Sequence, residues 1–76
     1  MNNKINELMA DVFRMKPEEI TDGLSKDDIG AWDSLRHMEL IVAFEQEFEI
    51  ELTFEEIVAM QSVKSIENIL GGKVVL

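Results

Sequence analysis

The sequence contains no cysteine, and its basic residues are few: seven against sixteen acidic ones in 76 residues. Without cysteine, and with a single histidine, the chain offers no disulfide framework and no convincing set of metal ligands, so no metal site is expected. No long uninterrupted apolar run is present, which predicts neither a signal peptide nor a membrane-spanning helix. We expect one cytoplasmic, monomeric domain over residues 1–76, with residues 73–76 as a flexible tail.

The formal net charge of −9 is the largest compositional anomaly. A charge of this sign repels nucleic-acid phosphates and anionic lipid, and so argues against nucleic-acid and membrane partners. It favours partner proteins with basic surfaces, in complexes that weaken as salt rises. A simpler alternative stays open, in which the charge only keeps the protein soluble.

Apolar periodicity predicts an all-α protein, a small bundle of three longer helices and one short helix. Asn2 or Asn3 can cap the first helix. Thr53 and Glu56 form a capping-box pattern for the short third helix, and Ser62 can cap the last one. Gly71 and Gly72 are typical of the end of that last helix. The apolar positions of the first helix have helical spacing: Ile5, Leu8, Met9, Val12 and Phe13.

A long irregular loop over residues 21–33 separates the first two helices. Gly23 and Gly30 interrupt it, while apolar side chains occur at intervals along it. A long loop held by apolar residues is usually ordered and often functional. We expect Trp32 to anchor this loop, and His37 nearby to pack or hydrogen-bond at the top of the bundle.

The second helix, over residues 34–49, has two apolar stripes. The inner stripe faces the expected core and comprises His37, Leu40, Ile41, Phe44 and Phe48. The outer stripe is flanked by acidic residues and comprises Leu35, Met38 and Val42, with Glu39, Glu45 and Glu49 beside it. An apolar strip with charged borders is typical of a docking surface. Alternatively, Met38 or Val42 packs against the long loop or the short helix.

Ser34 lies on the first turn of this helix, where backbone amides and the helix dipole favour an anion. A phosphodiester on its hydroxyl would therefore be well placed. Asp33 beside it could contribute to a metal ion brought by a modifying enzyme. The simpler interpretation is that Asp33 and Ser34 are an ordinary helix-capping pair.

The run Asp33-Ser34-Leu35, continued as an acidic and apolar helix ending in Glu47-Phe48, resembles the acyl carrier protein family. The resemblance extends through the capped short helix and the last helix, and also covers the first helix. It implies that Ser34 receives 4′-phosphopantetheine from coenzyme A, through a separate phosphopantetheinyl transferase that uses magnesium. The thiol of this arm would then carry acyl groups as thioesters, and the carrier itself would perform no catalysis.

The resemblance also assigns two surfaces. The partner-recognition face of the family corresponds to Leu35, Met38, Glu39, Val42 and Glu45. The cleft that shelters an acyl chain corresponds to Phe44, Ile57, Met60 and Ile66. Phe44, Ile57 and Ile66 are bulky for cleft positions, so we expect a carrier of short or modified groups, or one that leaves its cargo outside.

Departures from the fatty-acid synthesis carriers point to a stand-alone, specialised member of the family. Trp32 precedes the triplet where those carriers have smaller residues. Arg36 and His37 follow where those carriers tend to show an acidic and a small polar residue. The cargo could belong to fatty-acid, polyketide or another dedicated acyl-transfer pathway, with loading and transferring enzymes that present basic docking patches.

Two other functions remain open at this point. An aminoacyl or peptidyl carrier shares the arm chemistry, although carriers of that class are usually less acidic. An unmodified acidic helical adaptor would need the outer stripe but not the hydroxyl of Ser34. An enzyme is not expected, because the chain has no nucleophile–base pair, no phosphate loop and too few residues for an enclosed pocket.

Overall fold

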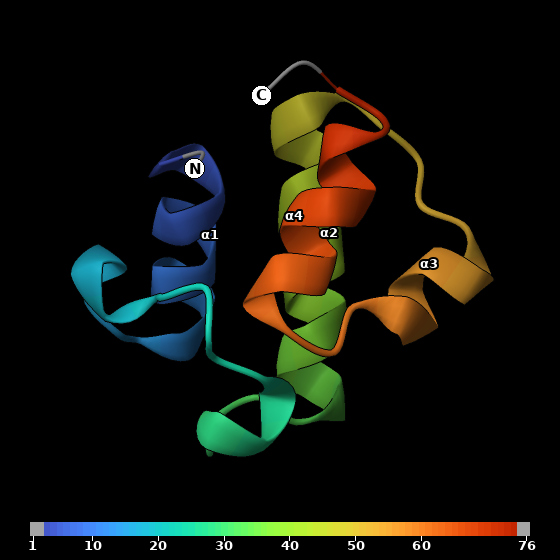
Figure 1. Ribbon diagram of the computed structural model, residues 1–76. Helices are drawn as coiled ribbons and strands as arrows, with labels where there is room; N and C mark the ends of the chain where they lie inside the picture. The colour runs from blue at the N-terminus through green and yellow to red at the C-terminus, as the bar shows by residue number, and fades with distance from the viewer. Residues whose placement is uncertain (1–2, 75–76) are drawn as a thin grey trace.

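The computed structural model describes residues 3–74 and contains four α-helices and two 3₁₀ turns (Figure 1). The elements are α1 (Asn3–Phe13), η1 (Pro17–Glu19), η2 (Lys26–Asp28), α2 (Ser34–Phe48), α3 (Phe54–Ala59) and α4 (Val63–Gly71). The expected all-α bundle of three longer helices and one short helix is confirmed. Asn3 is the first residue of α1 that the structure describes, whereas Asn2 and the last two residues of the expected tail lie outside the described residues.

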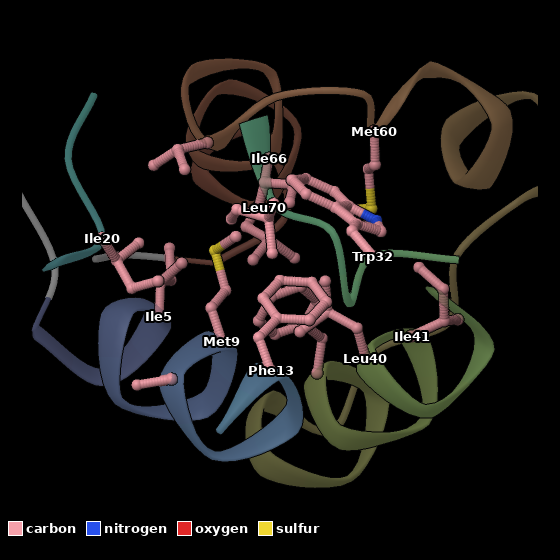
Figure 2. Close-up of a cluster of buried hydrophobic side chains, with 14 of the residues drawn as sticks. Ile5, Met9, Phe13, Ile20, Trp32, Leu40, Ile41, Met60, Ile66 and Leu70 are labelled. Carbon is pink, nitrogen blue, oxygen red and sulfur yellow. The ribbon is translucent and has the colours of Figure 1, made fainter. Parts of the chain in front are cut away.

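The three longer helices surround a common core (Figure 2), and α3 lies to one side of them (Figure 1). Each longer helix turns one apolar stripe inward, as Figure 2 shows for most of these side chains. The buried core residues of these helices include Ile5, Met9, Phe13, Leu40, Ile41, Phe44, Val63, Ile66 and Leu70. Burying this apolar surface supplies the main favourable free energy of folding.

The loop before α2 is ordered, as its apolar anchors predicted. Ile20, Ile29 and Trp32 are buried in the common core. The backbone also joins the loop to the start of α4: the Lys26 amide donates to the Gln61 carbonyl at 2.8 Å, and the Val63 amide donates to the Leu24 carbonyl at 3.0 Å. The loop therefore delivers the chain to the first residue of α2 along a fixed path.

Helix starts follow the sequence pattern closely. The Glu56 amide donates to the Thr53 hydroxyl at 3.1 Å, and the Thr53 amide donates to the Glu56 carboxylate at 2.8 Å. Ser62 caps α4 by accepting from the Ser65 amide at 3.1 Å. Both caps satisfy amides that a helix leaves without partners in its first turn.

Helix ends are less regular than the glycine pattern predicted. Gly72 follows α4 as expected, but its φ of −79° needs no glycine. The two left-handed positions among the described residues are instead Arg14, with φ 57°, and Glu49, with φ 54°. Glu49 closes α2, and the next amide donates back to the Glu45 carbonyl at 3.2 Å. A left-handed cap of this kind is most often glycine, because a side chain makes the conformation less favourable.

Candidate functional site

At the N-terminus of α2, Asp33 caps the helix and Ser34 is left exposed. Asp33 is the cap, and its Oδ1 accepts from the Arg36 amide at 2.9 Å. The first helical bond runs from the His37 amide to the Asp33 carbonyl at 2.8 Å. Ser34 is the first helical residue and is exposed. Its hydroxyl therefore stands at the surface and has no part in the cap.

The position of Ser34 favours an anionic substituent. The amides of Ser34 and Leu35 precede the first helical bond, so they belong to the positive end of the helix dipole. A phosphate ester on the hydroxyl would lie close to this end. The residues at the turn thus fit a phosphodiester-linked group, in charge as well as in access.

The two stripes of α2 have opposite environments. His37, Leu40, Ile41 and Phe44 are buried, and Phe48 packs against the core in a half-buried position. The outer residues Leu35, Met38 and Val42 are 69%, 50% and 47% exposed. Neither the loop nor α3 covers Met38 or Val42 to the extent that a core role would require. Met38 and Val42 are thus more exposed than expected if the long loop or the short helix packed over them.

Two of the acidic residues beside the outer stripe already have partners within the chain. Arg36 Nη1 lies 3.2 Å from Glu39 Oε2 and 3.3 Å from Glu39 Oε1. Glu45 Oε2 accepts from the Leu52 amide at 3.0 Å, which fastens the segment before α3 to α2. These contacts hold both carboxylates in place within the chain.

Two exposed apolar side chains on α3 were missed in the sequence. Phe54 is 77% exposed and Val58 is 52% exposed, one helical turn apart. The sequence did contain a sign of this exposure, because the short third helix has more apolar residues than one face can hold. In a helix of six residues with Ile57 facing inward, Phe54 and Val58 cannot both face the core as well. Beside them, Glu56 has its pKa lowered by the Thr53 amide and by Lys73, whose Nζ lies 3.0 Å from its carboxylate.

The four expected cleft residues meet in the core. Phe44, Met60 and Ile66 are fully buried, and Ile57 packs against the same cluster in a half-buried position. Figure 2 shows Met60 and Ile66 among the clustered side chains. A shallow hollow elsewhere, between α1 and η1, is lined by Asn6, Glu7, Pro17 and Glu18 and by none of these four.

Trp32 and His37 are joined just behind the exposed turn. Trp32 is buried, its ring centroid lies 5.0 Å from that of Phe13, and its Nε1 donates to His37 Nδ1 at 2.9 Å. His37 Nε2 lies 2.8 Å from the Ile57 carbonyl oxygen of α3. The expected roles, Trp32 as loop anchor and His37 as a hydrogen-bonding residue, are confirmed.

Within residues 3–74, no group of three or more histidine or acidic side chains is arranged to hold a metal ion. In the same part of the chain, no helix is both long and apolar enough to cross a membrane.

Comparison with known proteins finds matches along most of the chain. A family model described as a phosphopantetheine attachment site matches residues 3–70. An acyl carrier protein of Buchnera aphidicola subsp. Baizongia pistaciae is 41% identical over 71 residues, covering 92% of this chain and 90% of that protein. An acyl carrier protein of Petrotoga mobilis is 34% identical over 71 residues, covering 92% and 82%. One of Thermosynechococcus vestitus is 33% identical over 72 residues, covering 93% and 88%.

Proposed function

The chain belongs to the acyl carrier protein family, non-catalytic carriers with a covalent 4′-phosphopantetheine, and from this premise we propose that Ser34 bears the arm. The observation that supports this assignment is that Asp33 and Ser34 have different roles at the N-terminus of α2. Asp33 makes the cap, which leaves the exposed Ser34 hydroxyl available for modification. The chain has no cysteine, so the thiol that holds the cargo must come from the arm.

Asp33 is the residue that we propose to face the transferase and its magnesium ion. Its Oδ1 is held by the Arg36 amide, and the side chain is exposed. A carboxylate fixed in this way, next to the modified hydroxyl, is a suitable oxygen ligand for a hard cation. The carrier would supply this ligand and the hydroxyl, while the transferase would supply the catalytic groups.

The docking surface is proposed to comprise Leu35, Met38 and Val42 with Glu39 and Glu45. Residues 34–60 hold seven glutamates and one arginine, a net charge of −6 with His37 neutral. The exposed apolar stripe would provide affinity, and the acidic surroundings would orient a partner that carries basic residues. The exposed Phe54 and Val58 extend the apolar character of the region onto α3.

The cargo is proposed to be a short or modified acyl group, or one that stays outside the bundle. Phe44, Met60 and Ile66 fill the core where the family shelters a chain, and they are fully buried. Admitting a long chain would require displacement of well-packed side chains, which is costly. A packed core therefore fits a dedicated acyl-transfer pathway better than the carriage of long chains. We further propose that the carrier is monomeric and works in the cytoplasm.

Intact mass spectrometry tests the proposal directly. The protein is incubated with coenzyme A, magnesium and a broad-specificity phosphopantetheinyl transferase, with Ser34→Ala as the matched control. We expect the mass of one phosphopantetheine to be added to the wild type and none to Ser34→Ala. A folded wild-type protein that gains no mass would instead favour the unmodified acidic adaptor.

A second measurement addresses the cargo. The modified protein is loaded with an acetyl or an octanoyl group labelled with ¹³C, and the chain carbons are observed by NMR. We expect the octanoyl carbons to keep the shifts of a solvated chain. Shifts typical of an apolar interior would contradict a closed core. They would indicate that the protein shelters long acyl chains.

A further inference from the structure

The hydrogen bonds of His37 define its tautomer. An indole N–H can only donate, so His37 Nδ1 accepts from Trp32 Nε1 at 2.9 Å. A carbonyl oxygen can only accept, so Nε2 carries the proton and donates to Ile57 O at 2.8 Å. The imidazole is therefore neutral and links the loop before Ser34 to α3 through one buried ring. We name this set of contacts, Trp32–His37–Ile57, the clamp.

Helix α3 depends on few other contacts. None of its own residues is fully buried, and Ile57 alone packs against the core, in a half-buried position. Its N-terminus is closed locally by the Thr53–Glu56 box, and Glu56 pairs with Lys73 at the surface. Met60, the residue after α3, enters the core. Through His37, the clamp connects the body of this short helix to α2.

On the other side, the clamp reaches the turn that bears Ser34. Trp32 lies two residues before Ser34, and the Asp33 amide donates to the Ala31 carbonyl at 2.9 Å in the same turn. One rigid ring makes both hydrogen bonds, through different nitrogens. A buried indole N–H left without an acceptor is unfavourable, so the His37 ring should stay bonded to Trp32. A displacement of the Ile57 carbonyl with α3 should therefore change the position of the ring and, with it, the geometry of the bond from Trp32.

We propose that His37 is a positioning residue that couples the placement of α3 to the Ser34 turn. The proposal rests on the proposed function in so far as Ser34 is the modified residue. A partner that displaces α3 would, by this route, also alter the turn from which the arm emerges. The coupling itself is a property of the unmodified protein and can be measured without the arm.

Two substitutions of His37 separate the halves of the clamp. In His37→Asn, the amide oxygen stands near the Nδ1 position and can accept from Trp32, but the side chain is too short for Ile57. In His37→Gln, the amide nitrogen reaches toward the Nε2 position and can donate to Ile57, without a matched acceptor for Trp32. Trp32→Phe keeps an aromatic ring against Phe13 and removes only the indole N–H donor and ring bulk.

Amide hydrogen exchange over residues 54–60 is the first readout. We expect about tenfold faster exchange in His37→Asn and a smaller increase in His37→Gln, which keeps the bond to Ile57 but not the one from Trp32. Trp32→Phe should also accelerate exchange in α3, although the indole N–H bonds to His37 and not to α3. Unchanged exchange in both His37→Asn and Trp32→Phe would overturn the proposal. Glu47→Gln, which breaks a surface pair with Lys4 at 3.7 Å, is the control.

The fluorescence of Trp32, the single tryptophan of the chain, is the second readout. Thr53→Ala removes the cap of α3 at a distance from Trp32. We expect this change to shift the emission in the wild-type background and to have no effect in the His37→Asn background. Equal shifts in both backgrounds would show that the signal bypasses His37 and would overturn the coupling.

Transfer of phosphopantetheine to Ser34 gives the functional readout. We expect a severalfold lower kcat for His37→Asn, partial rescue in His37→Gln, and an unchanged KM for both, since neither alters the outer stripe. Unchanged kcat in His37→Asn with altered exchange would leave His37 a structural residue only and would overturn its positioning role. If the wild type accepts no arm, the proposed function fails, while exchange and fluorescence still decide the coupling.

Discussion

The two faces of α2 differ in what they require of the same fifteen-residue helix. The inner face places Leu40 and Phe44 in a close-packed core with no exposure to solvent. The outer face leaves Leu35 and Met38 half or more exposed. Folding explains the inner face, because burial of apolar surface stabilises the bundle. Folding does not require the outer face, which supports the proposal that a partner binds there.

The charged residues sharpen this contrast. Glu39 and Glu45, beside the outer stripe, are held by Arg36 and by the Leu52 amide. Glu67 on α4 has a different environment: among the described residues its Oε2 is shielded from solvent without a hydrogen-bond donor. Burial, and then the nearby Asp22 carboxylate, raise the pKa of Glu67. Glu39 and Glu45 are thus held in place by hydrogen bonds, whereas the negative charge of Glu67 destabilises the folded state.

The largest expected effect is on the inner face. Phe44→Ala should lower the free energy of unfolding by about 3–5 kcal/mol, because it leaves a cavity at a fully buried site. Leu35→Ala, on the outer face, should change it by less than about 0.5 kcal/mol. Urea denaturation at constant m-value measures both. Comparable losses in the two variants would mean that the outer stripe also serves the fold.

The next effect tests the outer face by function. Met38→Glu should leave the stability near that of the wild type and lower kcat/KM for phosphopantetheinyl transfer about tenfold, typical of losing one good interface contact. The control is Asn68→Glu, which adds the same charge on the exposed side of α4. Equal rates in the two variants would argue that the outer stripe takes no part in docking the transferase.

A smaller effect is expected at the C-terminus of α2, where both faces of the helix end. Glu49→Gly should stabilise the protein by about 1 kcal/mol, because the left-handed conformation at φ 54° disfavours a side chain. Glu49→Gln separates this from the loss of a negative charge. Gly72→Ala should be nearly neutral, since its φ is −79° and the nearest atom to an added Cβ is 3.5 Å away. A large loss in Gly72→Ala would contradict this geometry.

The smallest effect depends on pH. The pKa of Glu67 is raised, so the folded state prefers the protonated carboxyl, and this stabilisation is lost as pH rises through that pKa. Glu67→Gln should therefore stabilise the protein at neutral pH, by roughly 0.5 kcal/mol, and lose this advantage in acid. Glu56→Gln should do the reverse, because the pKa of Glu56 is lowered and its stabilisation disappears as pH falls. Melting temperatures between neutral and acidic pH measure both.

Much of the candidate site could be predicted from local patterns. The inner stripe of α2 follows from helical periodicity, and Thr53 and Ser62 follow from capping chemistry. The position of Ser34 at the helix start depends on a few neighbouring residues only. Such features need no knowledge of the rest of the chain, because their partners lie within one or two helical turns.

Other features depended on contacts between distant segments. The exposure of Phe54 and Val58 depends on how little of α3 the rest of the bundle covers. The bond from Glu45 to the Leu52 amide crosses a loop, and the bond from His37 to Ile57 joins residues twenty positions apart. Neither leaves a periodic signal in the sequence.

The sequence by itself therefore determined the helices, the N-terminal caps of α3 and α4, the acidic charge and the two stripes of α2. Each of these follows from residue type and from spacing over a few positions. Only the tertiary structure decided which acidic residues are engaged, where α3 lies, and that Trp32, His37 and Ile57 meet behind Ser34. These outcomes depend on how whole helices pack together, since a hydrogen bond between distant residues forms only after the core has set their separation.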